Sequence, residues 1–264
     1  MQRRYIELIR RDAVVLAVLQ RPEALNALNV EFIGELREVI SQLAADPAVA
    51  GVVVTGAGRS FCAGADISEM AAMSPPEAAE FAARGQRALL ELEDCGKPVL
   101  AAVNGYCMGG GLEVALACDF IVASESASFA FPEIGLGIIP GFGGTQRLAR
   151  LVGKGRAKEL VFSGERVDAA EAARIGLVNH VFPAHEFVER SVALMQRICA
   201  RGSYPLRLAK QVIDAGYDLD LANACLLERD SFALCFASPD QKEGMAAFLE
   251  KRPAVFRSPA VDKP

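Results

Sequence analysis

The sequence predicts an α/β fold with a helical C-terminal region. Three valine-rich apolar segments, at positions 14–19, 50–55 and 98–103, have the composition of buried strands. Segments in which apolar residues recur with helical spacing separate them, and strands that alternate with helices are typical of an α/β core. After Gly143 the strand signals fade, and helical patterns continue to Arg252.

The chain begins with an expected β-hairpin and an amphipathic helix. Positions 5–9 and 14–19 have the pattern of two short strands on either side of a turn. Asn29 is a favourable helix N-cap, because its side-chain oxygen accepts a hydrogen bond from a free backbone amide. The apolar residues that follow have helical spacing, at positions 32, 33, 36, 39, 40 and 43.

The second strand–helix unit contains a loop rich in small residues. The strand at 50–55 leads into a glycine-bearing loop from Gly56 to Asp66. Ser74, followed by two prolines, predicts the start of a helix that runs to about Asp94. The strand at 98–103 opens the third unit.

Three consecutive glycines mark the third unit. Gly109 to Gly111 lie between the strand at 98–103 and a short helix expected at 112–118. Positions 119–124 and 126–131 then favour strands through their β-branched and aromatic residues.

The remaining elements are expected to be helices, at 143–153, 155–164 and 168–175 and at four places between Ala184 and Arg252. Two of these helices carry an N-cap followed three residues later by a matching polar residue, Asp168 with Glu171 and Ser238 with Gln241. These four residues are predicted to be structural.

Tyr204-Pro205 predicts a hinge, because the residue before a proline disfavours helical geometry. We therefore expect a core of residues 1–203 and a helical region of residues 204–264.

Composition indicates a globular protein with one large core. The chain has 264 residues, of which 52% are hydrophobic and 23% charged. The uncharged stretch at 98–112 is too short for a membrane span, and no apolar segment of a signal peptide follows the basic N-terminus. A cytoplasmic protein without a membrane partner is expected.

Charge and metal-ligand patterns exclude other classes. The net charge is −5 with both signs interspersed, which makes nucleic acid an unlikely partner. The seven cysteines form no Cys-x-x-Cys pair, and His180 and His185 lie without a ligand cluster. Neither disulfides nor a metal site are expected.

Two glutamates beside glycine-rich segments are the strongest candidates for chemistry. Glu113 ends NGYCMGGGLE, and Glu133 lies twenty positions further on, in FPEIGLGIIPG. Two carboxyls favour acid–base chemistry, and unhindered amides at a strand-to-helix turn suit an anion that forms during reaction. On Gly109 to Glu113 alone, a tight turn with a solvated glutamate is an equally good interpretation.

A second loop of small residues precedes a helix. In FCAGADISEM, Ala63, Gly64 and Ala65 allow close approach of a ligand to the backbone, although Asp66 also fits as a simple helix cap. Parallel strands at 50–55 and 98–103 would bring this loop and the triple-glycine loop to the same edge of a sheet. Together they would offer paired amides.

Four segments in order, FCAGADI, NGYCMGGGLE, FPEIGLGIIPGFGGTQRLARLVG and EAARIGLVNHVFP, closely resemble the enoyl-CoA hydratase (crotonase) family. The resemblance covers essentially the whole chain. It implies a crotonase-like spiral of β-β-α turns, with residues 204–264 serving trimerisation and covering the active site. A homotrimer or a dimer of trimers is implied as well.

The resemblance also implies roles for individual residues. The amides of Ala65 and Gly110 would form an oxyanion hole for the thioester oxygen of an acyl-CoA. Glu113 would activate water, Glu133 would protonate Cα, and the Gly141 amide would position the water. Swapped or shared roles of the two glutamates stay open, since carboxyls so close titrate as a pair. The reaction implied is reversible syn addition of water to 2-trans-enoyl-CoA, giving 3-hydroxyacyl-CoA.

Substrate contacts follow from the same resemblance. The coenzyme A moiety, which is part of the substrate rather than a cofactor, would lie on Ala63, Ala65, Asp66, Ile67 and Ser68, with Lys251, Arg252 and Arg257 near its 3′-phosphate. A solvated helix end is an equally good interpretation of these basic residues. The acyl pocket would be lined by Met70, Met73, Tyr106, Leu112 and Phe142.

Three rivals remain on the sequence alone. A double-bond isomerase of the same superfamily needs an oxyanion hole and one base, so the presence of both Glu113 and Glu133 favours hydration. An RNA-binding homologue is disfavoured by the dispersed charge. An inactive scaffold is disfavoured because every expected functional position is filled.

Overall fold

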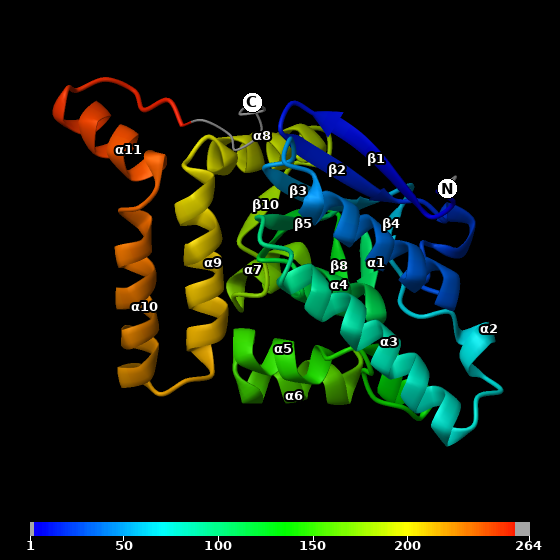
Figure 1. The fold of residues 1–264 in the computed structure, drawn as a ribbon. Coiled ribbons are helices and arrows are strands. Elements are labelled where there is room, and N and C mark those ends of the chain that lie inside the picture. The colour runs from blue at the N-terminus through cyan, green and yellow to red at the C-terminus, as the bar shows by residue number, and fades with distance from the viewer. Residues whose placement is uncertain (1–2, 257–264) are drawn as a thin grey trace.

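The computed structural model describes residues 3–256 and contains a largely parallel six-stranded sheet (Figure 1). The strand order is β1-β2-β3-β5-β7-β10, and only β1 and β2 pair antiparallel within it. The strands are β1 (Ile6–Arg11), β2 (Val14–Leu19), β3 (Gly51–Gly56), β5 (Val99–Val103), β7 (Phe120–Ser124) and β10 (His180–Phe182). The predicted hairpin and the predicted central strands are confirmed to within two residues.

A second, four-stranded sheet was not predicted. It consists of β4 (Ser60–Cys62), β6 (Tyr106–Met108), β8 (Ser128–Ala130) and β9 (Val167–Asp168). Each of the first two strands follows a strand of the large sheet and precedes a helix, so the chain advances in β-β-α turns. The expected spiral is therefore confirmed. Among its strands only β8 was expected, at 126–131. The other three have two or three residues each and carry too little alternation to be recognised from sequence.

The helices match the predicted ones closely. They are α1 (Val30–Ala45), α2 (Ile67–Met70), α3 (Pro75–Glu93), α4 (Gly110–Leu116), α5 (Gly144–Val152), α6 (Lys154–Ser163), α7 (Ala169–Arg174), α8 (Phe187–Cys199), α9 (Ser203–Tyr217), α10 (Leu221–Cys235) and α11 (Pro239–Leu249), with 3-10 turns η1 (Pro22–Ala24) and η2 (Pro132–Leu136). Asn29, Asp168 and Ser238 each accept a backbone hydrogen bond at a helix start, as predicted.

Two apolar layers hold the large sheet. On one face, α1 buries the six positions that its spacing predicts and packs beside α3. On the other face, Phe187 and Met195 of α8 pack on Leu16, Val53 and Leu100. The central strands β2, β3 and β5 are buried on both faces, which explains their continuous valine-rich sequences.

The C-terminal helices α9, α10 and α11 form an arm beside the core (Figure 1). The hinge prediction at Tyr204-Pro205 is wrong in position, because both residues lie in the first turn of α9. Proline is tolerated there, where its missing N–H has no partner in the helix. The break falls instead at residues 200–202, between α8 and α9. Among residues 3–256, no helix combines the length and apolar character that a membrane crossing requires.

Candidate active site

Two loops that follow neighbouring strands lie against each other. β4 and β6 pair in parallel, so the loop after β4, with Gly64 and Ala65, leaves the second sheet beside the loop after β6, with Gly109 and Gly110. A Cβ placed on Gly110 would lie 3.3 Å from the amide nitrogen of Ala65. The φ angles of Gly64 and Gly109 are +109° and +48°, in the region that favours glycine. The predicted meeting of the two glycine loops is thus observed.

Two amides in these loops have no internal partner. Within residues 3–256, the amides of Ala65 and Gly110 donate to no acceptor. Their neighbours are bonded: the Asp66 amide donates to the carbonyl of Leu28, and the Gly109 amide donates to a carbonyl of β8. Two adjacent free donors, fixed by bonded neighbours, suit an oxygen atom that gains negative charge.

Each glycine of the triple has its own close contact. A Cβ on Gly109 would lie 2.6 Å from Oε1 of Glu133, and a Cβ on Gly111 would lie 2.1 Å from the carbonyl oxygen of Cys62. A side chain at Gly109 would push Glu133 away, and one at Gly111 would separate α4 from β4. The glycines therefore allow α4 to begin directly beside the first loop.

Glu113 lies in the first turn of α4 and is 2% exposed. Its Oε1 accepts hydrogen bonds from the amides of Phe142 and Gly144, both at 2.7 Å. Burial raises the pKa of this carboxyl, whereas the two amides and the Arg147 guanidinium act in the opposite direction. The amides favour the ionised form and fix its orientation, and Oε2 is left for a water molecule.

Glu133 lies in η2 and is 8% exposed. Its Oε2 is buried and has no hydrogen-bond partner among the described residues. Burial, and secondarily the nearby Glu113, raise the pKa of Glu133 to about 7. A carboxyl in such a site favours its protonated form, as a general acid requires.

The two carboxyls therefore differ in the way that acid–base catalysis needs. Glu113 has two donors that favour the anion, and Glu133 has none besides its own backbone amide. Both lie beside the free amides of the loops, since Glu133 contacts Gly109 and Glu113 is three residues after Gly110. This arrangement suits acid–base chemistry on a molecule whose oxygen gains negative charge.

The loop expected to bind coenzyme A is already internally bonded at most of its amides. The Ala63 amide donates to the carbonyl of Leu25, and the Ser68 amide donates to the Asp66 carboxylate. That carboxylate also forms an ion pair with Arg21 at 2.8 Å. Ser68 and then Arg21 lower the pKa of Asp66, and Ile67 is exposed. The Ala65 amide, by contrast, donates to no acceptor within residues 3–256 and is open to a ligand.

The basic residues expected near the phosphate are not brought to this loop. Lys251 follows α11, at the opposite end of the molecule from α2 (Figure 1). Arg252 is engaged by Glu243 and Glu250. Within one chain Lys251 and Arg252 lie away from this loop, because the arm leads α11 away from the core, and their contact with the 3′-phosphate stays a prediction. Arg257 lies outside the described residues.

The five residues expected around the acyl chain have different surroundings, and their contact with an acyl chain stays a prediction. The ring of Phe142 lies beside the loops, since a Cβ on Gly110 would be 3.4 Å from its Cε2. Leu112 is 1% exposed and belongs to the main apolar core. Tyr106 begins β6 and packs under the Arg166 guanidinium. Met70 and Met73 are partly buried against the core near α2.

Sequence reasoning missed the donors to Glu113. The Gly141 amide has no acceptor within the described residues, but it is Phe142 and Gly144 that bond the carboxylate. Arg147, treated as an ordinary helical residue, donates to the carbonyl of Phe142 at 2.9 Å. Two adjacent glycines before a helix were the available signal, because they mark a backbone that something approaches closely.

Comparison with known proteins places this site in a family. The sequence profile described as "Enoyl-CoA hydratase/isomerase" matches residues 10–259. The chain belongs to the enoyl-CoA hydratase/isomerase family. A protein named "Crotonyl-CoA hydratase" from Syntrophomonas wolfei is 46% identical over 254 residues, which cover 96% of this chain and 98% of that protein.

Two further relatives agree. A "Short-chain-enoyl-CoA hydratase" from Clostridium acetobutylicum is 46% identical over 240 residues, covering 90% of this chain and 92% of that protein. The crystal structure of an enoyl-CoA hydratase from Bacillus anthracis superposes with a TM-score of 0.93 at 38% identity, covering 97% of this chain and 100% of that one. The resemblance of the four sequence segments is thereby confirmed.

Proposed function

We propose that the protein is an enoyl-CoA hydratase, which adds water reversibly to 2-trans-enoyl-CoA thioesters and gives 3-hydroxyacyl-CoA. The observation that carries the proposal is the pair of buried glutamates, one whose oxygen accepts hydrogen bonds from two amides and the other with a pKa raised to about 7. An isomerase needs only one base, whereas hydration needs a base and an acid. The names of the two relatives that are 46% identical support the same reaction.

The amides of Ala65 and Gly110 would stabilise the negative charge that develops on the thioester oxygen during the reaction. An α,β-unsaturated thioester accepts a nucleophile at Cβ only to the extent that its carbonyl oxygen takes up negative charge. Donors from Ala65 and Gly110 would stabilise that charge without reorganising. Each donor contributes about 3 kcal/mol to such a transition state.

The two carboxyls would carry the proton transfers. Glu113, through Oε2, takes a proton from water as the water oxygen bonds to Cβ. Glu133 gives its proton to Cα as the enolate collapses. The proton taken up by Glu113 then passes to Glu133, so both carboxyls regain their starting states and one water molecule is consumed per turnover. The Gly141 amide is proposed to help orient the water. The reverse reaction uses the same groups in exchanged roles.

The proposal is tested by following loss of the conjugated-thioester absorbance with 2-trans-enoyl-CoA substrates of increasing chain length. Rapid loss with crotonyl-CoA, and formation of 3-hydroxybutyryl-CoA, are expected. Conversion of 3-enoyl-CoA without hydration of 2-enoyl-CoA would instead identify an isomerase.

The pH dependence of hydration is expected to be bell-shaped. Because the pKa of Glu133 is about 7 and the acid must be protonated, kcat/KM should fall as pH rises through neutrality. At low pH, protonation of Glu113 removes the base. The acid and alkaline limbs of the profile report the titration of the two carboxyls as a coupled pair, not of each residue alone. Initial rates with crotonyl-CoA across the pH range test this, and a profile that stays flat above neutrality would contradict it.

Phe142 is expected to limit the acyl chain. Its ring packs against α3 so closely that a Cβ on Gly85 would lie 2.2 Å from Cδ1, and Phe81 lies beside it at 5.3 Å between ring centroids. Phe142→Leu keeps the backbone amide that bonds Glu113 and replaces the ring with a smaller side chain. The kcat/KM ratio of 2-octenoyl-CoA to crotonyl-CoA should rise by roughly 10-fold. An unchanged ratio would mean that the acyl chain lies elsewhere, and Phe162→Leu on the exposed face of α6 is the control.

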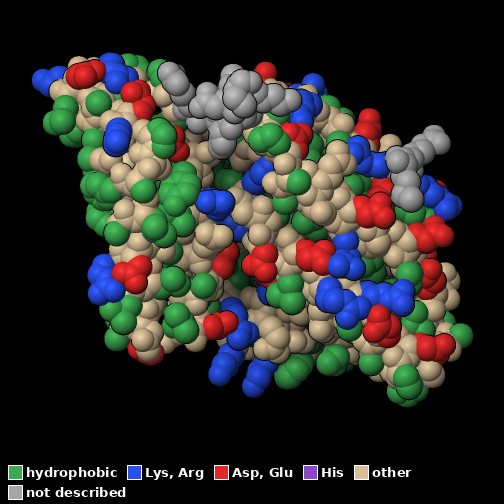
Figure 2. Space-filling view, in the orientation of Figure 1, with side chains coloured by type: hydrophobic (Ala, Val, Ile, Leu, Met, Phe, Trp, Pro, Cys, Tyr) green, Lys and Arg blue, Asp and Glu red, His purple; other side chains and the backbone are tan. Residues whose placement is uncertain are grey.

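The arm supports the proposal of a homotrimer or a dimer of trimers. Large apolar side chains are exposed along it (Figure 2), including Ile213, Tyr217, Leu221, Phe232, Phe248 and Leu249. Exposed apolar surface of this extent on a folded chain is typical of a subunit interface. A cytoplasmic location stays a prediction.

A further inference from the structure

The turn that holds Glu113 is irregular and depends on its surroundings. Residues 141–144 precede α5 and include Gly143, whose φ is +104°. The amides of Phe142 and Gly144 converge on one carboxylate oxygen. A small rotation of either peptide would lose a bond to Glu113, so whatever fixes this turn also fixes the carboxylate.

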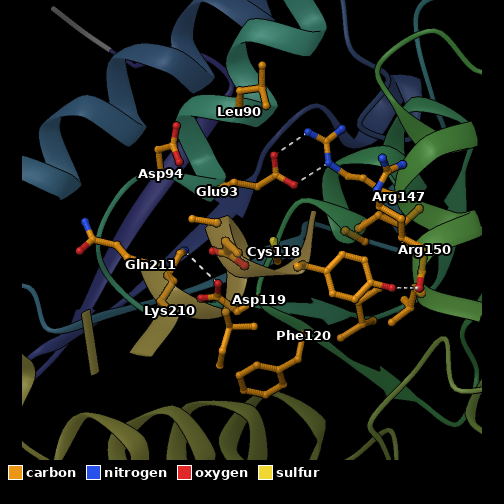
Figure 3. Close-up of a pocket in the computed structure, with 18 of the residues that line it drawn as sticks. Leu90, Glu93, Asp94, Cys118, Asp119, Phe120, Arg147, Arg150, Lys210 and Gln211 are labelled. Carbon is orange, nitrogen blue, oxygen red and sulfur yellow. Dashed lines mark hydrogen bonds and ion pairs between the residues drawn. The ribbon is translucent and has the colours of Figure 1, made fainter. Parts of the chain in front are cut away.

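Arg147 is the side chain that holds the turn. Its guanidinium donates to the carbonyl of Phe142 at 2.9 Å through one terminal nitrogen. The other two nitrogens form a fork on Glu93, at 2.6 and 2.7 Å (Figure 3). A Cβ on Gly143 would lie 2.2 Å from the guanidinium, so only glycine there admits this contact. Arg147 is nearly buried, with 15% of its side chain exposed.

Helix α3 provides the rigid support for this arrangement. Glu93 is its last residue, and Gln86, two turns earlier, donates to the carbonyl of Gly141 at 2.8 Å. The carbonyls of Gly141 and Phe142 are thus both bonded. The first accepts from Gln86 of α3, and the second accepts from Arg147, which is paired with the last residue of α3. The Glu93–Arg147 pair lies at the edge of a cleft between the core and α9, where Asp94, Asp119, Lys210 and Asp214 also gather.

We propose that Glu93 and Arg147 are positioning residues for catalysis, which fix the Phe142–Gly144 turn so that its two amides hold the Glu113 carboxylate. The inference rests on the proposed function for its kinetic readout. Bidentate arginine–carboxylate pairs are rigid because both partners are planar and share two parallel hydrogen bonds. Neither residue touches the substrate, and both act through the backbone of the turn.

Removing the fork should impair turnover more than binding. Arg147→Met is expected to lower kcat for crotonyl-CoA by roughly 100-fold, the loss typical of a small misplacement of a catalytic group. The Kd of saturated butyryl-CoA should change less than about twofold, since the thioester site is intact. Glu93→Gln, which weakens the fork but leaves the arginine in place, should give a smaller loss in the same direction.

The pH profile provides a readout that loss of stability alone would not move. Burial raises the pKa of Glu113, and the Arg147 charge is the smallest of the effects that oppose this rise, so Arg147→Met should shift the acid limb of kcat/KM to slightly higher pH. Arg147→Lys keeps the charge and loses the fork, so it should restore the acid limb but not the full kcat. If Arg147→Met does not fold, the lysine variant tests the proposal through its lowered kcat at an unmoved acid limb, and a kcat within about threefold of wild type would then overturn it.

Arg37 is the matched control. Arg37 lies on α1, and its guanidinium makes a similar fork on Glu91, two residues before Glu93 on α3, so this pair joins α1 to α3 and does not bond the turn. Arg37→Met should leave kcat and the acid limb unchanged. An Arg147→Met enzyme with kcat within about threefold of wild type and an unmoved acid limb would overturn the proposal.

Amide hydrogen exchange separates this inference from the proposed reaction. Exchange at Phe142 and Gly144 should accelerate at least about 10-fold in Arg147→Met and not in Arg37→Met. Accelerated exchange in a protein that hydrates no enoyl-CoA would uphold the structural link and refute the proposed function. Unchanged exchange would refute the link even in an active hydratase.

Discussion

Replacing Glu133 by glutamine is expected to lower kcat for hydration of crotonyl-CoA by about 10³-fold, the usual contribution of a general acid. Glutamine has nearly the same shape as the protonated carboxyl but no proton of suitable acidity for Cα. Initial rates at saturating substrate measure the effect. The alkaline limb of the pH profile should disappear with the residue that produces it. Glu165→Gln on the surface is the control.

The stability of the same variant separates lost chemistry from lost folding. The pKa of Glu133 is raised in the folded protein, so the protonated form stabilises the fold, fully at acidic pH and less as pH rises through about 7. Above neutrality the ionised, buried carboxylate is unfavourable. Glu133→Gln should therefore unfold at the same or a higher temperature than wild type at alkaline pH.

A kcat of Glu133→Gln within about threefold of wild type would refute the assignment of Glu133 as the acid.

Replacing Glu113 by glutamine is expected to lower kcat by about 10³- to 10⁴-fold. The glutamine side-chain oxygen can still accept from the amides of Phe142 and Gly144, so the turn should keep its geometry. What is lost is the negative charge that takes a proton from water. Near-normal binding of butyryl-CoA should accompany the slow turnover.

The double variant tests whether the two carboxyls act as a unit. Groups that serve one step are strongly non-additive, so Glu113→Gln combined with Glu133→Gln should be little slower than the slower single variant. A double variant whose losses multiply would indicate two independent steps. Glu113→Gln with unaltered kcat would show that another base activates water.

Local features of the sequence were sufficient for most of the fold. Helix α1 is defined by its N-cap Asn29 and the spacing of its apolar residues, and both signals lie within the helix itself. The start of α3 at Ser74 likewise depends on neighbours in sequence. The two glycine loops were recognisable because close backbone approach demands small residues wherever it occurs.

Long-range pairing explains what the sequence did not reveal. β4 and β6 are each three residues long and exist because they pair with one another across the spiral. Arg147 and Glu93 are 54 residues apart, and no local pattern connects them. Lys251 was expected beside the loop that follows β4, but the direction of the arm depends on packing between whole helices.

The central claim is that one thioester oxygen is bound by the amides of Ala65 and Gly110 while Glu113 and residue 133 face the same side of the alkene. A crystal structure of the slow Glu133→Gln variant with crotonyl-CoA tests it most directly. The account predicts the thioester oxygen within hydrogen-bond distance of both nitrogens, and a water molecule between Glu113 and Cβ. Two results would contradict it. One is a thioester oxygen bound away from the amides of Ala65 and Gly110, and the other is a Glu113 side chain on the opposite face of the double bond from the side chain at position 133.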